Sequence, residues 1–481
     1  MKKLILLFAV MIGLAGLNIG HVEAQHPADS SNMTLLGHNP LQARSAYQPI
    51  IHQQGSRWIA YIGHHGGSAF NPLTNAVENN GVSIVDVTNP RSPVYLHHIP
   101  GPSGAGEAGG AQMVRVCNGT DLPGVTSADV EGVFLLRAHG NEAHQVYDVR
   151  NPSSPVLRTT VVSGLEGTHK NWWECDTGIA YLVSGVPGWR TERMTQIFDL
   201  SNPRSPVHIR DYGLVGQEPG STGEVPTDLH GAISAGHRVY FGHGTSSNGT
   251  VQIADRTKLL TGPAEPTPDN LTFPIIAQFD TSPLVGAHTT FPILGVRVPD
   301  LGLFNVGGTR DILAIVNEST ANECTGEAHQ MVFFADVTIE STPQVISSYH
   351  VPDPEGIFCR RGGRFGAHSS NESFTPIYYG RILFVAYFNA GVRAVDIRNP
   401  FEPKEIAYFV PATTASTDPR AGKIAIQTNN VEVDDRGLIY IVDRANTGLH
   451  VLELTGSARD IANLPLQQQQ VEVQSRLTTR E

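Results

Sequence analysis

Histidines are the residues of this chain whose spacing points most directly to chemistry. The sequence holds 20 of them, and four of those that end a Gly-x-His or Asp-x-His triplet lie at one position of a repeated unit: His169, His230, His288 and His368. Imidazole nitrogen binds Zn, Cu, Fe and Ni, and three or four neutral imidazoles with one open coordination position make a catalytic rather than a purely structural centre. These four residues are therefore candidate metal ligands.

A repeated strand-and-turn unit must position these histidines. The segment Ser83-Ile-Val-Asp-Val-Thr-Asn-Pro90 returns in similar form three times and in weaker form three more times, every 51 to 81 residues. Its acidic markers are Asp86, Asp148, Asp199, Asp255, Asp336, Asp396 and Glu453. The Asn-Pro step ends each strand because proline fixes φ and lacks an N–H donor. Two further strands precede each marker and one follows it, so seven units predict an all-β fold, a seven-bladed β-propeller with four-stranded blades.

The two ends of the repeat region indicate how the ring closes. The seventh unit stops at its third strand, near Leu454, while Met33-Thr-Leu-Leu-Gly-His38 stands alone before the first unit. We expect this N-terminal strand to complete the last blade, because pairing the two ends removes open sheet edges. The propeller then covers residues 25–456, and residues 457–481 are expected to form a disordered polar tail.

Alignment on the markers puts the four histidines at the start of the innermost strand in four successive blades. Innermost strands surround the axial channel of a propeller, so these imidazoles would meet there. We expect His52 at this position in the first blade, Gln112 in the second and Asn429 or Asn430 in the seventh. The ends of the second strands return to the same face and supply possible further site residues: His64, His65, His139, His243, Glu318 and Asp443.

Three functions are compatible with this pattern. The leading hypothesis is that the axial histidines bind a transition metal, Cu or Fe, for oxidative chemistry on a small molecule; the sequence identifies no catalytic residue and leaves open whether the protein is an enzyme. The second is a non-catalytic scaffold that binds a cell-envelope component, because repeats copy residues by descent and the histidines can be structural. The third is a zinc-dependent hydrolase, in which Zn replaces Cu or Fe.

The repeat resembles the LVIVD family, whose units carry a Val-Ile-Val-Asp-Val-Ser-Asn-Pro type of strand and turn. The resemblance extends over nearly the whole chain beyond its N-terminal segment and implies the propeller fold without an activity. At the level of fold the chain is also similar to the selenium-binding/methanethiol-oxidase proteins and the carotenoid oxygenases, which are seven-bladed and built around a histidine-bound metal. That similarity implies an axial metal by analogy alone.

The four cysteines fit an oxidising compartment, where two disulfides are expected rather than metal thiolates. Cys117 and Cys175 both end innermost strands of neighbouring blades, on the side opposite the histidines, and Cys324 and Cys359 both lie in loops that flank the fifth blade. We predict the pairs Cys117–Cys175 and Cys324–Cys359. The alternative is four unpaired buried cysteines.

The N-terminus predicts export. Lys2 and Lys3 precede an apolar stretch from Leu4 to Leu17, and Val22-Glu-Ala24 has small residues at the positions that favour cleavage before Gln25. We expect residues 1–24 to be a signal peptide and the mature protein to be periplasmic or extracellular, with no membrane-spanning segment. A net charge of −12 without a run of Lys or Arg excludes a nucleic-acid partner. The oligomeric state is left open.

Overall fold

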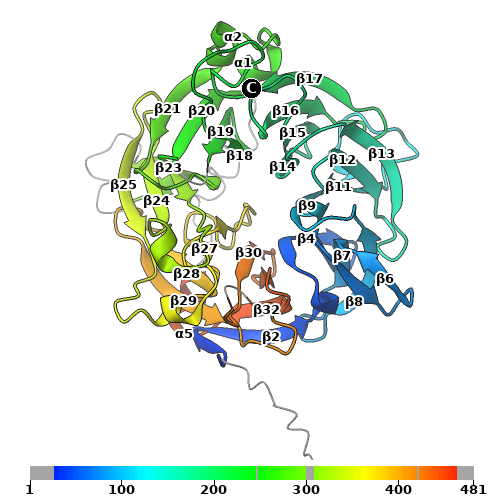
Figure 1. Cartoon of the computed structure of the whole chain (residues 1–481), viewed down its shortest axis with the longest axis vertical. Helices are drawn as coiled ribbons and strands as arrows, with labels where there is room; N and C mark the ends of the chain where they lie inside the picture. The colour runs from blue at the N-terminus through cyan, green and yellow to red at the C-terminus, as the bar shows by residue number, and fades with distance from the viewer. Residues whose placement is uncertain (1–25, 245–246, 299–307, 420–421, 463–481) are drawn as a thin grey trace, which may run out of the picture.

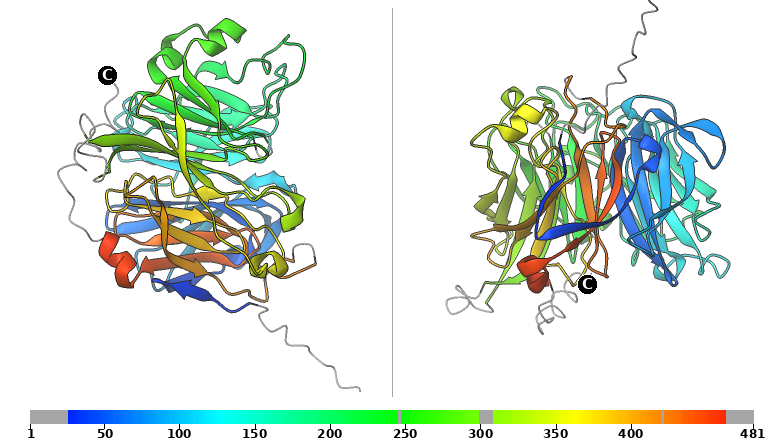
Figure 2. Two further views of the ribbon diagram at one scale, coloured as in Figure 1. Left: turned by 90° about the vertical axis from the view of Figure 1, so that its left-hand side faces the viewer. Right: turned by 90° about the horizontal axis from the view of Figure 1, so that it is seen from below.

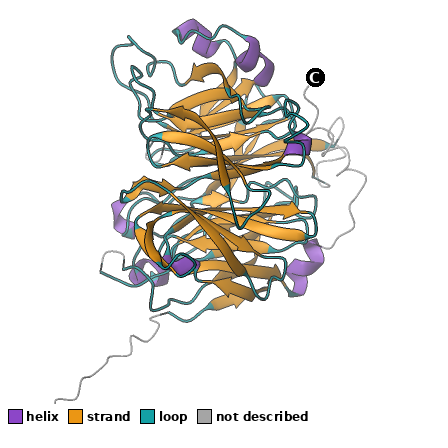
Figure 3. Cartoon of the chain, turned by 90° about the vertical axis from the view of Figure 1, so that its right-hand side faces the viewer, coloured by secondary structure: helices purple, strands orange, loops and turns teal. Residues whose placement is uncertain are grey.

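The structure is a computed structural model that describes residues 26–244, 247–298, 308–419 and 422–462. The predicted signal peptide lies outside these residues, as does most of the predicted tail. Seven sheets stand in a ring around one axis (Figure 1), and strands dominate the described chain (Figure 3). The predicted seven-bladed β-propeller is therefore confirmed.

The first three blades run from the axis outward in chain order. The first holds β3 (Ala46–Gln54), β4 (Arg57–Gly66), β7 (Gly81–Asp86) and β8 (Val94–Pro100), with β9 (Gly106–Ala111) paired to the end of β4 and a side hairpin of β5 (Ser68–Asn71) and β6 (Ala76–Asn79). The second holds β10 (Val114–Asn118), β11 (Val133–His139), β12 (Ala143–Asp148) and β13 (Val156–Ser163). The third holds β14 (Asn171–Trp173), β15 (Ile179–Ser184), β16 (Met194–Asp199) and β17 (Val207–Tyr212).

The remaining blades complete the ring. The fourth holds β18 (Leu229–Ala235), β19 (Arg238–His243), β20 (Thr250–Asp255) and β21 (Ile275–Asp280). The fifth holds β22 (Thr289–Arg297), β23 (Thr309–Val316), β24 (Val332–Asp336) and β25 (Gln344–Tyr349). The sixth holds β26 (Ser369–Ser370), β27 (Ile382–Ala386), β28 (Val392–Asp396), β29 (Lys404–Val410) and the added β1 (Asp29–Ser31); the seventh holds β30 (Thr428–Val433), β31 (Ile439–Asp443), β32 (Gly448–Leu454) and β2 (Met33–Asn39).

The acidic marker of the repeat works by capping the turn that follows its strand. The carboxylates of Asp86, Asp199 and Asp336 each accept a hydrogen bond from the backbone N–H two residues later, at 2.8–2.9 Å. This is an Asx turn, which satisfies a backbone donor just where the strand ends. Asp255 instead caps the first turn of α1 (Arg256–Thr261), because it accepts from the N–H of Lys258 at 2.9 Å. The helix is part of an insertion that explains the widest gap between markers.

Closure of the ring follows the prediction. β2 pairs antiparallel with β32, with Met33 opposite Leu454 (Figure 2, right). β1 extends the closure by pairing with β29 of the sixth blade, from Asp29 opposite Val410, which the sequence analysis did not foresee. The N-terminal segment therefore pairs with the last two blades and holds the ring closed.

Four short α-helices lie outside the blades in the part of the chain that the structure describes: α1, α2 (Pro268–Thr272), α4 (Ile357–Arg361) and α5 (Gly456–Ala462). Short 3-10 turns cover Leu41–Ala43, Gly119–Asp121 and Cys324–Gly326. α5 corrects the prediction that the tail is disordered from residue 457, because Ala458 and Ala462 are buried in the core between blades six and seven. Residues 463–481 lie outside the described chain. None of the described helices has the length and apolar character needed to cross a membrane.

Both predicted disulfides are confirmed. Cys117–Cys175 links the innermost strands of the second and third blades, and Cys324–Cys359 links a 3-10 turn after β23 to helix α4 before β26. No free cysteine is present, which excludes the alternative of four unpaired thiols.

We predict that Met33→Ala weakens ring closure. Met33 is 2% exposed and packs in the core of the last two blades, so removing its side chain should lower the free energy of unfolding by about 2–5 kcal/mol. The measurement is chemical denaturation followed by tryptophan fluorescence. Leu35→Ala is the control, since Leu35 is 42% exposed on the same strand and its loss should cost under about 1 kcal/mol. Equal losses for the two variants would contradict the role of Met33.

Candidate metal centre on the propeller axis

One residue from each blade stands at the start of the innermost strand and faces the axis. We call this set the axial ring: Tyr47, Gln112, His169, His230, His288, His368 and Asn429. His169, His288 and His368 donate their backbone N–H to the end of the second strand of the same blade, at 2.9–3.0 Å. His230 and Asn429 occupy a β-bulge at this place, where the pairing between the first and second strands shifts. The four histidines therefore lie at the start of the innermost strand of their blades, as predicted.

The four imidazoles pack against one another from blade to blade. Ring centroids are 4.8 Å apart for His169 and His230, 3.5 Å for His230 and His288, and 4.2 Å for His288 and His368. The Nε2 atoms of His169 and His230 are 3.0 Å apart. The side chains of consecutive blades therefore form one continuous group.

A carboxylate completes this group. His230, His288 and Glu318 each offer a ligand atom, and these three atoms lie within 4.8 Å of one another. A carboxylate oxygen of Glu318 is also 3.7 Å from Nε2 of His368. Two nitrogens bound to one ion at about 2.0–2.2 Å are at most about 4.4 Å apart. The donor atoms thus stand close to the separations that ligands of one metal ion adopt.

The Nδ1 atoms of two histidines are held by backbone carbonyls. Nδ1 of His230 lies 2.7 Å from the carbonyl oxygen of His288, and Nδ1 of His368 lies 2.5 Å from that of Asn429. A carbonyl only accepts, so these Nδ1 atoms carry the hydrogen and each neutral ring keeps a lone pair on Nε2. Nε2 of His230 faces Nε2 of His169, and Nε2 of His368 has no hydrogen-bond partner. Nδ1 of His288 lies 2.9 Å from the hydroxyl of Thr289. Such bonds orient metal-binding histidines in proteins.

Burial keeps these imidazoles neutral. It lowers the pKa of each of the four histidines well below its ordinary value, and nearby cations such as Lys170, Arg193 and Arg444 lower it further. Neutral imidazole is the form that binds a metal ion. Burial raises the pKa of Glu318, and Arg364, which donates to its carboxylate at 2.9 Å, opposes that rise.

Buried ion pairs cross the axis on the far side of the ring. Glu372 from the sixth blade accepts hydrogen bonds from Lys170 in the third blade and Arg115 in the second. These residues lie one to four positions further along the chain than the axial-ring residues of their blades, so they form a layer beneath the ring. We call Arg115, Lys170 and Glu372 the axial ion-pair network. The network therefore joins three blades across the axis.

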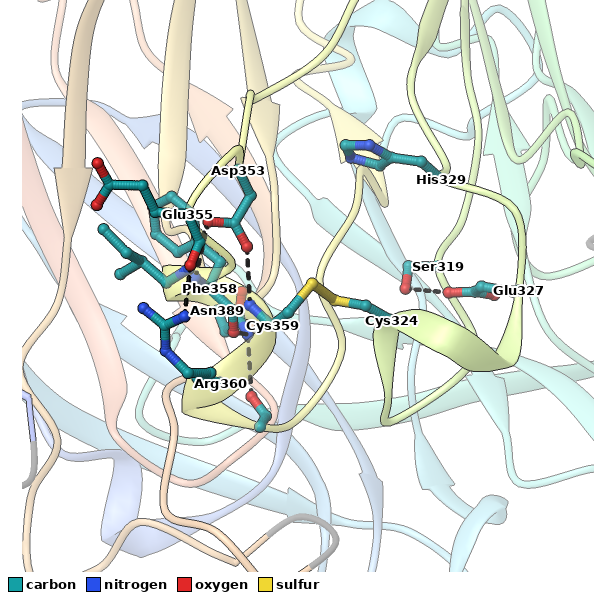
Figure 4. The surroundings of a disulfide bond; sticks show 12 residues. Ser319, Cys324, Glu327, His329, Asp353, Glu355, Phe358, Cys359, Arg360 and Asn389 are labelled. Atoms are coloured by element: carbon teal, nitrogen blue, oxygen red, sulfur yellow. Dashed lines mark hydrogen bonds between the residues drawn. A yellow bond between two sulfur atoms is a disulfide. The ribbon is translucent and has the colours of Figure 1, made fainter.

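The Cys324–Cys359 disulfide (Figure 4) joins the segment that follows Glu318 in the chain to helix α4, which precedes Arg364. On one side, the carboxylate of Glu327 accepts from the N–H of Thr320 at 2.8 Å, two residues after Glu318. On the other, Asp353 accepts from the N–H of Cys359 at 3.0 Å and fixes helix α4. A pocket of about 410 Å³ opens beside this disulfide, lined by His329, His350 and Phe365 among others.

Several predicted residues stand away from the ring centre. His52 does not occupy the axial position of the first blade, because it lies near the far end of β3 and bonds to Asn118 at 2.8 Å. His64 is held by Ser83 at 2.7 Å, and His139 bonds to Arg137 at 3.1 Å. His243 is buried at the end of β19, where Gln252 faces it. His52, His64 and His139 therefore have local hydrogen-bond partners.

Three other predicted positions agree with the structure. Gln112 and Asn429 hold the axial position in the second and seventh blades. Asp443 ends β31 and accepts from the N–H of Gln427 at 2.6 Å, so it fixes the approach to Asn429. Of the second-strand histidines, His65 lies nearest the ring, with its centroid 5.1 Å from that of Tyr47.

Tyr47 is the axial residue that sequence reasoning missed. Its hydroxyl is 3.1 Å from Nε2 of His169 and 3.5 Å from Nε2 of His288. Burial raises the pKa of its phenol well above the ordinary value. A signal was present, because Ala46-Tyr47 stands in its blade as Ala287-His288 and Ala367-His368 do in theirs. A search restricted to histidine does not find Tyr47.

Comparison with known proteins bears on family and fold. The family model of the LVIVD repeat matches residues 76–98, which contain the first marker of the repeat. No curated protein matches the chain.

Solved structures resemble the chain in fold. The crystal structure of Chaetomium thermophilum Raptor has a TM-score of 0.51 at 10% identity, over 90% of this chain and 30% of that one. The crystal structure of the Myceliophteria thermophila Cps50 (Swd1) β-propeller domain has a TM-score of 0.45 at 10% identity, over 89% of this chain and 100% of that one. The chain thus spans about 30% of the length of Raptor. At this identity the likeness to Raptor shows the fold alone.

The axial ion-pair network generates a stability prediction. Against the effect of burial, Lys170 and Arg115 lower the pKa of Glu372 from 4.5 to about 2. Glu372→Gln leaves two buried cations without their anion and should cost about 3–5 kcal/mol of unfolding free energy at neutral pH. The pKa of Glu372 is lower in the folded than in the unfolded protein, so the wild type loses this stabilisation as the pH falls from about 4.5 toward 2. The difference in unfolding free energy between the wild type and Glu372→Gln should shrink over the same range. Denaturant titrations at several pH values measure this.

Glu402→Gln is the matched control. Glu402 forms an exposed pair with Lys404 at 3.4 Å, so the same change should cost at most about 1 kcal/mol. If Glu372→Gln lowered the free energy of unfolding as little as Glu402→Gln, the axial ion-pair network would not be stabilising the fold.

Proposed function

We propose that this chain, an LVIVD-repeat β-propeller, binds a transition-metal ion on its axis and uses it in oxidative chemistry on a small molecule. The observation that carries the proposal is the convergence of His230, His288 and Glu318 on one point, with His169 and His368 alongside. A non-catalytic scaffold would be expected to have imidazoles that point apart or bond to the backbone. His230 and His368 do bond backbone carbonyls through Nδ1, while their Nε2 atoms lie 3.0 Å from Nε2 of His169 and 3.7 Å from Glu318 respectively.

The donor set suits Cu, Fe or Zn, because these metals bind imidazoles together with a carboxylate, whereas Mg and Ca take oxygen ligands. A bound Cu or Fe ion would supply one-electron chemistry. Zn is the less favoured metal, because a zinc hydrolase needs a carboxylate free to act as a base and Glu318 is already engaged by Arg364 at 2.9 Å.

The protein's own residues define how such a centre would work. The carbonyls of His288 and Asn429 fix the rings of His230 and His368, so the lone pairs are held in place before a metal arrives. The axial ion-pair network crosses the axis on one side of the ring, and Glu318 and Arg364 lie beside His368. A small-molecule substrate would approach from the side of Glu318 and Arg364.

Metal content of the purified protein tests the proposal. We expect the wild type, purified without chelators, to hold about one ion of Cu or Fe per chain, and a His230→Ala/His288→Ala variant to hold almost none. Atomic absorption or emission spectrometry makes the measurement. The control is His208→Ala/His237→Ala, which removes two exposed histidines and should leave the metal content unchanged.

Two results would contradict this proposal. One is a wild-type protein that takes up no Cu or Fe even when these ions are added to the chelator-treated chain. The other is full metal content in the His230→Ala/His288→Ala variant. A colourless, redox-silent ion in the wild type would instead favour the zinc hydrolase.

We also infer that the protein is exported to the periplasm or the extracellular space, where the signal peptide is removed after Ala24. The two disulfides support this inference, because disulfides persist in oxidising compartments. The expected outcome is a mature N-terminus at Gln25, read by mass spectrometry of protein secreted from a bacterial host. An intact Met1 in the folded, disulfide-bonded protein would refute cleavage.

A further inference from the structure

Tyr47 holds in the first blade the place that histidine holds in four others. It lies at the start of β3, where the pairing with β4 shifts between Ala46 and Pro49, as it does around His230 and Asn429 in their blades. The residue is 1% exposed. The repeated backbone therefore aims this side chain at the same point as the imidazoles.

The phenol oxygen lies among the candidate ligand atoms. It is 3.1 Å from Nε2 of His169 in the third blade and 3.5 Å from Nε2 of His288 in the fifth. Both separations fall within the roughly 4.4 Å that two ligands of one ion can span. The oxygen thus contacts the same nitrogen atoms that the proposed metal would bind.

The Tyr47 ring is fixed in this orientation. It packs edge-on against His65, His169 and His368, at centroid distances of 5.1, 5.4 and 5.7 Å. Its backbone carbonyl accepts from the side-chain amide of Asn429 at 3.3 Å. Packing on several sides leaves the hydroxyl little freedom to turn away from the axis.

We propose that the phenol oxygen of Tyr47 is a ligand of the axial metal. This inference rests on the proposed function and adds to it an anionic oxygen donor from the first blade. When the ion binds, the O–H bond of Tyr47 breaks, an oxygen–metal bond forms and the proton leaves to solvent. Phenolate bound to Fe(III) or Cu(II) gives a visible ligand-to-metal charge-transfer band, which neutral imidazoles do not give in the same way. The ligand therefore has its own optical signature.

The test compares wild type with Tyr47→Phe and Tyr61→Phe after loading chelator-treated protein with Fe(III) or Cu(II). Tyr61→Phe is the matched control, because Tyr61 is also fully buried in the first blade and its hydroxyl bonds to Gln54 at 3.0 Å, away from the ring. Metal content is measured by atomic spectrometry, and the band by absorption and resonance Raman spectroscopy. Thermal unfolding confirms that each variant is folded.

We expect the wild type and Tyr61→Phe to bind metal and show phenolate vibrations under the band. Tyr47→Phe should retain at least half of the metal through its histidines and lose the band entirely. A metal-loaded wild type without phenolate vibrations, or a band that survives in Tyr47→Phe, would overturn the role of Tyr47 while leaving the metal centre intact. Absence of bound metal from the wild type would overturn both proposals.

Discussion

Closure of the ring is the constraint on which the rest of this structure depends. A blade buries its faces only against its neighbours, so each core belongs to two or more blades. One core joins residues of the fourth, fifth and sixth blades, among them Ile233, Phe291 and Leu383, and another joins Ala60 of the first blade to Tyr440 of the seventh. β2, which pairs with β32, packs Leu36 against the second of these cores and links the two ends of the chain.

The same closure brings polar residues into the interior. Seven innermost strands face one axis, so side chains that would be solvent-exposed on an isolated sheet are buried there. Buried polar groups are tolerated only with partners, and here the partners come from distant blades: Glu372 bonds to Lys170 and Arg115 across the axis. At the ring of histidines, Nε2 of His169 and Nε2 of His230 face each other at 3.0 Å, and Nε2 of His368 has no hydrogen-bond partner.

Much of the fold could be predicted from the sequence because the repeat encodes it locally. The Asp and Asn-Pro marker shows where strands end, since its carboxylate caps the turn. The cysteine pairing followed from placing each residue on one face of a blade. The register of the four histidines followed from the spacing between triplet and marker. Features without a repeated pattern, such as β1 and helix α5, were not predictable in this way.

The misplaced residues have a physical explanation. His52 was assigned to the axis by residue type, but it pairs with Ile59 near the far end of β3, whereas Tyr47 stands at the start of that strand. Glu318 could be placed on the correct face from strand direction, whereas its approach to His368 depends on the loop that Arg364 and the Cys324–Cys359 disulfide hold. Cross-blade distances of this kind depend on how seven sheets pack, which no single repeat contains.

The axial ion-pair network also connects parts of the ring that the sheets do not. Its bonds join the sixth blade to the second and third across the axis. The charge of one carboxylate is therefore balanced from blades on the opposite side of the ring, and those blades can separate only by breaking these pairs.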